Sequence, residues 1–275
     1  MKIALCLHGY MSNAKGLDSF VAGYHYIHQK ILEGNDVDVF VHCWEPEQKQ
    51  LYDLHYEKKT IRGEFETQKD FKNFDVCKNQ SWFDEGIDRA RCPWPTNTIE
   101  RTLSFLYSRK KSIYLKNSYE KQYNFKYDCT ILSRFDLGNR GKECSQKYYA
   151  TNFNLKKDSS MDSLHCAFWD QFNHGLPDHW FYGNSSVMTK IADLYEDVAT
   201  YYDKDSEYVD SCLNGWVDSN LTEQFSNEGF KKYKDKCKNL YRWDRWQCID
   251  NHKLYKWHTY KNKIPLSLVD ITKDL

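Results

Sequence analysis

An arginine and an aspartate close an apolar run near the middle of the chain. The segment Tyr127-Asp-Cys-Thr-Ile-Leu-Ser-Arg-Phe-Asp-Leu137 predicts a buried strand that ends at Arg134 and Asp136. Both charges then emerge together at the carboxyl edge of a sheet. A carboxylate at such a place can bind a divalent cation or a ribose hydroxyl, and the fork of an arginine neutralises phosphate. A plain surface ion pair is the alternative interpretation.

A polar turn follows the first apolar run. The sequence His8-Gly-Tyr-Met-Ser-Asn-Ala-Lys-Gly16 is similar to the His-Gly loop of α/β-hydrolases, whose backbone amides build an oxyanion hole. Those enzymes also need a Gly-x-Ser-x-Gly nucleophile elbow, and none of the 12 glycines belongs to one. A hydrolase with an irregular elbow stays open as a function. The turn can equally have no chemical role, or its amides can contact a nucleotide diphosphate.

His42 ends the second apolar run, Asp36–Cys43, and is expected at the same edge. It can contact a nucleobase or ribose, and a structural histidine is the alternative. The chain has no His-Glu-x-x-His, no zinc-type Cys/His spacing and no glycine-rich phosphate fingerprint. Zinc hydrolase, P-loop kinase and nicotinamide dehydrogenase therefore lose their usual support.

Hydrophobic periodicity predicts alternating strands and helices in the first 65 residues. The strands are 2–7, 36–43 and 60–65, and the helices are 17–31 and 46–58. This βαβ pattern is typical of a parallel sheet with right-handed crossovers. The fold class is therefore α/β, with a mostly parallel central sheet flanked by helices.

The rest of the chain is less regular, and no repeat or linker divides it, so a single domain over 1–275 is expected. A long polar loop is predicted at 66–95, followed by a helix at 96–120 and the strand at 127–134. A turn-rich loop at 138–147 comes next. The remaining expected elements are helices near 186–201 and 219–232 and strands near 163–169 and 253–259.

Charge and composition narrow the partners and the compartment. The formal net charge is +0 at pH 7, whereas proteins that hold polyanions usually carry a basic excess, so nucleic acid is not an expected partner. No run of 18 apolar residues predicts a transmembrane segment, and the apolar start is too short for a signal peptide. The 10 cysteines lack a Cys-x-x-Cys pair, and several lie in apolar runs, which favours a reducing, cytoplasmic location.

Four segments together resemble a family of small glycosyltransferases found in bacteria and in large algal viruses such as chloroviruses. They are Lys2-Ile-Ala-Leu-Cys-Leu-His-Gly, Asp38-Val-Phe-Val-His-Cys-Trp44, the strand at 127–137 and Asp178-His-Trp-Phe-Tyr-Gly183. Their order and spacing match over roughly residues 1–200. The resemblance implies a single Rossmann-like GT-A domain, with a nucleotide-sugar-binding half at 1–137 and an acceptor-binding half at 138–275. A viral member would act in the host cytoplasm.

The resemblance also implies a donor and its contacts. The expected donor is a UDP-sugar, with UDP-xylose favoured by analogy, and the acceptor is an oligosaccharide or a glycoprotein glycan. The donor-binding residues are expected to be His8, Gly9, Tyr10, His42, Arg134 and Asp136.

GT-A enzymes hold a metal with an Asp-x-Asp motif, and here Arg134 stands where the first aspartate is expected. Mn²⁺ or Mg²⁺ would then bind Asp136 and His258, with His252 as the substitute for His258. Arg134 would take over part of the charge neutralisation.

The acceptor side is expected around Asp178. Deprotonating an acceptor hydroxyl while the nucleotide leaves from the other side requires a general base, and the resemblance gives that role to Asp178 in an inverting reaction. His179, Trp180 and Tyr182 are the expected acceptor contacts. In the alternative, Asp178 only caps a turn and Trp180 belongs to the core. A noncatalytic carbohydrate-binding protein remains a third class of function, one that also fits the aromatic content of 16%.

Overall fold

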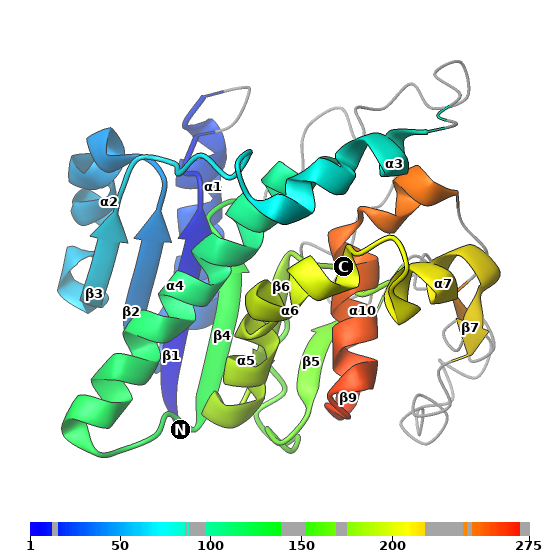
Figure 1. Cartoon of the computed structure of the whole chain (residues 1–275). Coiled ribbons are helices and arrows are strands. Elements are labelled where there is room, and N and C mark those ends of the chain that lie inside the picture. Colours follow the sequence, from blue (N-terminus) through cyan, green and yellow to red (C-terminus); the bar gives the residue numbers. More distant parts are fainter. Residues whose placement is uncertain are drawn as a thin grey trace.

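The computed structural model describes residues 1–12, 16–85, 87, 97–138, 152–168, 175–217, 239–240 and 244–269. These residues form a seven-stranded sheet in the order β3-β2-β1-β4-β6-β5-β9, with helices on both of its faces (Figure 1). The strands of this sheet are β1 (Lys2–Gly9), β2 (Asp36–Cys43), β3 (Thr60–Phe65), β4 (Cys129–Arg134), β5 (Leu164–Ala167), β6 (Trp180–Gly183) and β9 (Leu266–Val269). A separate two-stranded ribbon pairs β7 (Trp216–Val217) with β8 (Asn239–Leu240).

The sheet is mostly parallel, as expected. β1 pairs in parallel with β2 and β4, β2 with β3, and β5 with β9. Only β6 runs antiparallel to its neighbours β4 and β5 among these strands. The α/β class and the flanked, mostly parallel sheet are therefore confirmed.

β1 is apolar along almost its whole length because both of its faces are covered. Ile3, Leu5 and Leu7 pack in the same cluster as residues of α1 (Asp18–Ile27) and α2 (Lys49–Tyr56). Ala4 and Cys6 belong to the cluster on the other face of the sheet, which contains buried side chains of five later helices. These helices are α4 (Ile99–Tyr123), α5 (Ser185–Ala192), α6 (Leu194–Tyr201), α7 (Glu207–Asn214) and α10 (Asn251–Lys261).

α4 is the helix that crosses the centre of the sheet. Thr98 caps it by accepting a hydrogen bond from the backbone of Arg101, and Asn124 ends it in the left-handed conformation at φ 52°. It packs against β1 and β2. It begins at the end of the sheet toward which the arrows of β1 and β2 point (Figure 1). The first turns of α4 therefore lie where these strands end.

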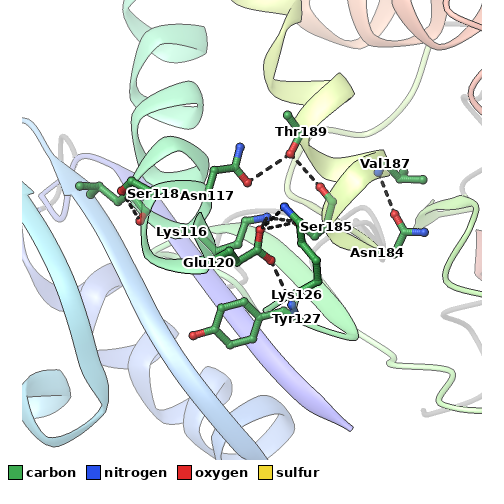
Figure 2. Close-up of polar contacts among 11 residues, drawn as sticks. Lys116, Asn117, Ser118, Glu120, Lys126, Tyr127, Asn184, Ser185, Val187 and Thr189 are labelled. Carbon is green, nitrogen blue, oxygen red and sulfur yellow. Dashed lines mark hydrogen bonds and ion pairs between the residues drawn. The ribbon is translucent and has the colours of Figure 1, made fainter. Parts of the chain in front are cut away.

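The other end of α4 is fastened by a buried ionic cluster (Figure 2). The side chains of Lys116 and Glu120 are both 0% exposed, and their charged groups lie 3.3 Å apart. The Glu120 carboxylate also accepts from the Ser185 hydroxyl at 2.7 Å and from the backbone N–H of Tyr127 at 3.0 Å. One carboxylate thus joins α4, the start of α5 and the segment that leads into β4.

Several expected elements differ from the structure. The strand expected at 253–259 is wrong, because these residues lie inside α10, whose N-cap Asp250 accepts from two backbone N–H groups. All seven side chains from Lys253 to Thr259 are buried, so no polar face marks the helix in the sequence. The polar loop expected at 66–95 contains the short helices η4 (Asp75–Asn79) and α3 (Gln80–Asp84).

Other expectations are met only in part. The helix expected at 186–201 is divided into α5 and α6, and the strand expected near 163–169 is β5. The helix expected at 219–232 and most of the loop at 138–147 lie outside the described residues. In the described part of the chain, no helix has the length and apolar character needed to cross a membrane.

Candidate functional site

A pocket of about 550 Å³ lies at the carboxyl ends of β1 and β4. The order β3-β2-β1-β4 changes direction between these two strands, and ligands of open α/β sheets bind at such a switch point. The turn after β1 contributes residues 8–12, while Trp44 and Gln68 follow β2 and β3. The first turns of α4 contribute residues between Glu100 and Phe105, α1 contributes Ser19, and the end of β4 contributes Arg134 and Asp136.

Arg134 and Asp136 form a bidentate ion pair in this pocket. Nε of Arg134 donates to Oδ1 of Asp136 at 2.9 Å, and Nη2 donates to Oδ2 at 2.6 Å. The two side chains remain 38% and 31% exposed. A guanidinium has five N–H donors, so three donors of Arg134 have no partner in the described part of the chain and can bind a ligand. The two residues are therefore both an ion pair and part of the pocket wall.

The turn after β1 is tied to α4. His8 is buried, and its Nε2 accepts a 3.0 Å hydrogen bond from Nε of Arg109. Gly9 has φ +102°, a conformation that favours glycine, and its N–H donates to the hydroxyl of Ser108 at 2.9 Å. Tyr10 is 46% exposed, and its ring lies at the pocket.

Glu45 holds the next residues of this turn and was not expected from the sequence. Its carboxylate accepts from the backbone N–H of Met11 at 2.5 Å and of Ser12 at 2.9 Å, and also from the Ser12 hydroxyl. Glu45 lies two residues after the end of β2, so its place at the same edge of the sheet was the available signal. Because Glu45 and Ser108 occupy the amides of Met11, Ser12 and Gly9, these three amides are not free to bind a diphosphate or an oxyanion.

His42 lies beneath the pocket rather than in its lining. It is fully buried, with Nδ1 2.7 Å from the Ser108 hydroxyl and Nε2 3.0 Å from Glu66. Burial lowers the pKa of His42, and Glu66 opposes this effect. His42 therefore supports the turn after β1 through Ser108 and does not lie where it was expected to contact a nucleoside.

Ser108, His42 and Glu66 have the residue types of a catalytic triad. Ser108 is fully buried within α4, and its oxygen accepts the Gly9 N–H. A nucleophile must be reachable by its substrate. Ser108, His42 and Glu66 therefore support the turn at Gly9. Ser108 cannot serve as the nucleophile of a serine hydrolase, because it is buried.

Asp178 is ion-paired away from the pocket lining. Its carboxylate lies 3.2 Å from Nε2 of His252, and the side chain is only 9% exposed. Burial alone would raise the pKa of Asp178, but the charges of His252 and Arg109 outweigh it and hold this pKa well below its usual range. Burial likewise opposes protonation of His252, but Asp178 raises the pKa of that imidazole to about 9. Such a carboxylate is a weak proton acceptor, so the geometry does not favour Asp178 as general base.

The expected acceptor platform is part of the core. Trp180 and Tyr182 lie in β6 and are at most 1% exposed. The Trp180 indole donates to the carbonyl of Asn152 at 2.9 Å, and the Tyr182 ring stacks on His165 at 4.4 Å. Neither ring offers a face to a sugar, in agreement with the core alternative for Trp180.

His179 precedes β6, and its carbonyl accepts from the Arg134 backbone at 3.4 Å. Burial lowers the pKa of His179 to about 4. The imidazole of His179 therefore stays neutral at physiological pH. His179 lies beside the end of β4 at Arg134 and is not among the residues that line the pocket.

The expected metal ligands are not brought together. His258 lies in α10, where Nε2 contacts the carbonyl of Lys190 at 2.7 Å and Nδ1 contacts the Tyr201 hydroxyl at 3.2 Å. Both oxygens of Asp136 are bonded to Arg134, and His252 is paired with Asp178. Across the described ranges, no group of three or more His, Cys, Asp or Glu residues has the arrangement of a metal site. The described residues therefore do not fit the cation that the resemblance implied.

Comparisons with known proteins do not add to this picture. The chain matches no protein-family model and no curated protein. The geometry alone defines a pocket with unpaired guanidinium donors and an aromatic wall. These groups suit a ligand that carries both negative charge and a flat ring.

Proposed function

We propose that the pocket binds the nucleotide part of a sugar-nucleotide donor and that the protein is a glycosyltransferase with a GT-A-type domain. The observation that carries the proposal is Arg134 at the switch-point pocket, where three of its N–H donors have no partner among the described residues. Arg101 also lines this pocket, within the first turn of α4. The N-terminus of a helix carries a partial positive charge that favours phosphate. The guanidinium groups of Arg134 and Arg101 can thus bind a diphosphate, against the opposing charges of Asp136 and Glu100 in the same lining.

The size and walls of the pocket support the same ligand class. A volume of about 550 Å³ lies within the range of roughly 300–1,000 Å³ that is typical of small-molecule sites. Tyr10 and Phe105 supply aromatic surface for a base. The described lining residues fall between His8 and Asp136, which fits a donor site in the first half of the chain.

In this proposal Arg134 stabilises the negative charge that develops on the leaving diphosphate, and electrostatic stabilisation of this kind usually contributes most to the rate of such a transfer. The donor is a UDP-sugar, with UDP-xylose first among the candidates by family resemblance. The acceptor is an oligosaccharide or a glycoprotein glycan. Cys6, Cys43 and Cys129 are buried and form no disulfide among the described residues, which agrees with a reducing cytoplasm as the place of action.

Calorimetric titration with UDP, GDP and dTDP tests the ligand class. We expect UDP to bind the unmodified protein and Arg134→Ala to weaken this binding about 10- to 100-fold, because a hydrogen bond to a charged group contributes about 1.5–3 kcal/mol. Arg62→Ala is the matched control, since Arg62 contacts Ser118 and Gln122 near the far end of α4. Equal weakening by both variants, or no binding of any nucleotide, would contradict the proposal.

A further inference from the structure

One nitrogen of His8 has no protein partner even though the ring is buried. His8 is 1% exposed and lines the pocket, and its Nδ1 has no hydrogen-bond partner within the described residues. Buried polar atoms are nearly always hydrogen-bonded, so an exception calls for a ligand or a water molecule. The free nitrogen of His8 is thus a candidate contact for whatever fills the pocket.

The other nitrogen of the ring determines which tautomer His8 adopts. Nε2 lies 3.0 Å from Nε of Arg109, and a guanidinium can only donate. Nε2 must therefore accept, and the single ring proton resides on Nδ1. The unpartnered atom is consequently an N–H donor rather than an acceptor.

The surroundings keep this ring neutral. Burial lowers the pKa of His8 well below its usual value, and the charges of Arg109, Arg134 and His42 act in the same direction. Asp178 is the acidic group that opposes them. A second proton on Nε2 would also point directly at the Arg109 N–H. The Nδ1–H group of His8 therefore remains a hydrogen-bond donor over the physiological pH range.

Arg109 is itself held from several sides. It is 1% exposed, and its guanidinium lies 4.4 Å from the ring centre of Phe105, 4.9 Å from that of Tyr255 and 5.2 Å from that of Phe181. Its Nη2 donates to the backbone carbonyl of Asp178. Cation–π contacts of this kind orient a guanidinium without using its Nε–H. Arg109 is therefore positioned to act on His8.

His8 and Arg134 are register partners on adjacent parallel strands. Both residues line the pocket, so a ligand there can lie beside the His8 ring and the remaining donors of Arg134. An oxygen with several lone pairs and a negative charge complements such a set of donors.

We propose that His8 is a fixed, neutral hydrogen-bond donor to a phosphate oxygen of the bound nucleotide, and that Arg109 is the positioning residue that locks its tautomer. The inference rests on the proposed function, because it names the part of the donor nucleotide that His8 contacts. Arg109 acts only through His8 and does not touch the ligand.

Nuclear magnetic resonance of the full chain labelled with ¹⁵N-histidine tests the lock directly. We expect the His8 ring to have a protonated Nδ1 and a bare Nε2, without titration between about pH 5.5 and 8, and His8→Asn assigns its signals. Adding UDP should shift the Nδ1 signal. An Nε2-protonated ring, or titration near the ordinary value of about 6.5, would overturn the inference. This measurement uses the unmodified protein and does not depend on a variant that folds.

Two substitutions separate the inference from the proposed function. His8→Leu should weaken UDP binding about 10-fold, because it removes a donor to a charged oxygen, whereas His8→Asn can place an amide N–H near the Nδ1 position. Arg109→Met should free Nε2 to carry the ring proton, so that His8 adopts both tautomers in the ¹⁵N spectrum and UDP affinity falls. Turnover of a sugar nucleotide with an unmoved His8 signal would refute the inference and leave the function standing. Absence of all nucleotide binding would refute the proposed function. The tautomer of His8 would still show whether Arg109 fixes the ring proton on Nδ1.

Discussion

The backbone N–H of Gly9 donates a 2.9 Å hydrogen bond to the hydroxyl of Ser108, 99 residues further along the chain. The same hydroxyl lies 2.7 Å from Nδ1 of His42. A single buried side chain of α4 therefore fastens the turn that forms one wall of the pocket to the end of β2.

Ser108→Ala should loosen this turn. It leaves the partly buried N–H of Gly9 and the buried ring of His42 without the Ser108 hydroxyl, which costs about 1–3 kcal/mol of unfolding free energy for each group left unsatisfied. Ser112→Ala is the matched control, because Ser112 is equally buried on the same helix and, among the described residues, its hydroxyl donates to the Arg109 carbonyl of its own helix. Urea unfolding and UDP titration of both variants measure the effect. Equal losses in the two variants would contradict the role of Ser108.

Asp136 leads to a prediction about metal ions. Both of its carboxylate oxygens are occupied by Arg134, so a cation would have to displace a bidentate pair. We therefore expect UDP affinity to change by less than about threefold, or about 0.7 kcal/mol, between buffers with Mn²⁺ and with EDTA. A loss of UDP binding in EDTA that is restored by Mn²⁺ would show that the pair opens to admit a metal.

The Asp178–His252 pair predicts how stability depends on pH. The pKa of His252 is raised to about 9, so its contribution is complete below its unfolded value and is lost as pH rises through 9. The pKa of Asp178 is depressed, so its contribution is present above its unfolded value and is lost in acid. The pair is thus most stabilising between about pH 4 and 6.5.

Asp178→Asn should remove most of this dependence. Between pH 6 and 9.5 the unmodified protein should lose up to about 3 kcal/mol of unfolding free energy through His252, and the variant should lose much less through this group. Urea unfolding at the two pH values measures the difference. The same loss in both proteins would show that the pair is not the source.

The buried cluster at the far end of α4 gives a stability test that is independent of function. Glu120→Gln leaves the buried Lys116 ammonium without its carboxylate and should cost about 3–5 kcal/mol. Lys126 binds the same carboxylate at 2.9 Å but is 72% exposed, so Lys126→Ala should cost less than about 1 kcal/mol. Thermal or urea unfolding separates the two cases. Similar losses of unfolding free energy in the two variants would mean that burial does not determine how much each lysine's ion pair with Glu120 stabilises the fold.

The sequence predicted the first half of the fold well and the second half poorly. Strands such as Asp36–Cys43 and Thr60–Phe65 were predicted with their observed bounds, because apolar runs bounded by polar turns are a local signal. β6 and β9 span only four residues each, and α10 is buried on all sides, so none of them carries a clear period. Their structure depends on tertiary packing rather than on local pattern.

The pocket was predicted in part for the same reason. Arg134, Asp136 and the turn at His8 follow apolar strands, and parallel strands bring their carboxyl ends to one edge. Arg109 and Ser108 come from the middle of a long helix, where nothing in the sequence marks them as supports of a turn 99 residues away. Trp180 was assigned to a sugar although it is core, because residue type alone does not report burial.

The central claim is that the pocket at β1 and β4 binds a sugar nucleotide for transfer. The most direct test is nucleotide release from UDP-, GDP- and dTDP-sugars, with UDP-xylose among them, by the unmodified protein and by Arg134→Ala. The account predicts release from one UDP-sugar, stimulation by a glycan acceptor, and a loss of about 10-fold or more in Arg134→Ala but not in Arg62→Ala. Absence of release from every donor, together with no binding of any of the three nucleotides, would contradict it.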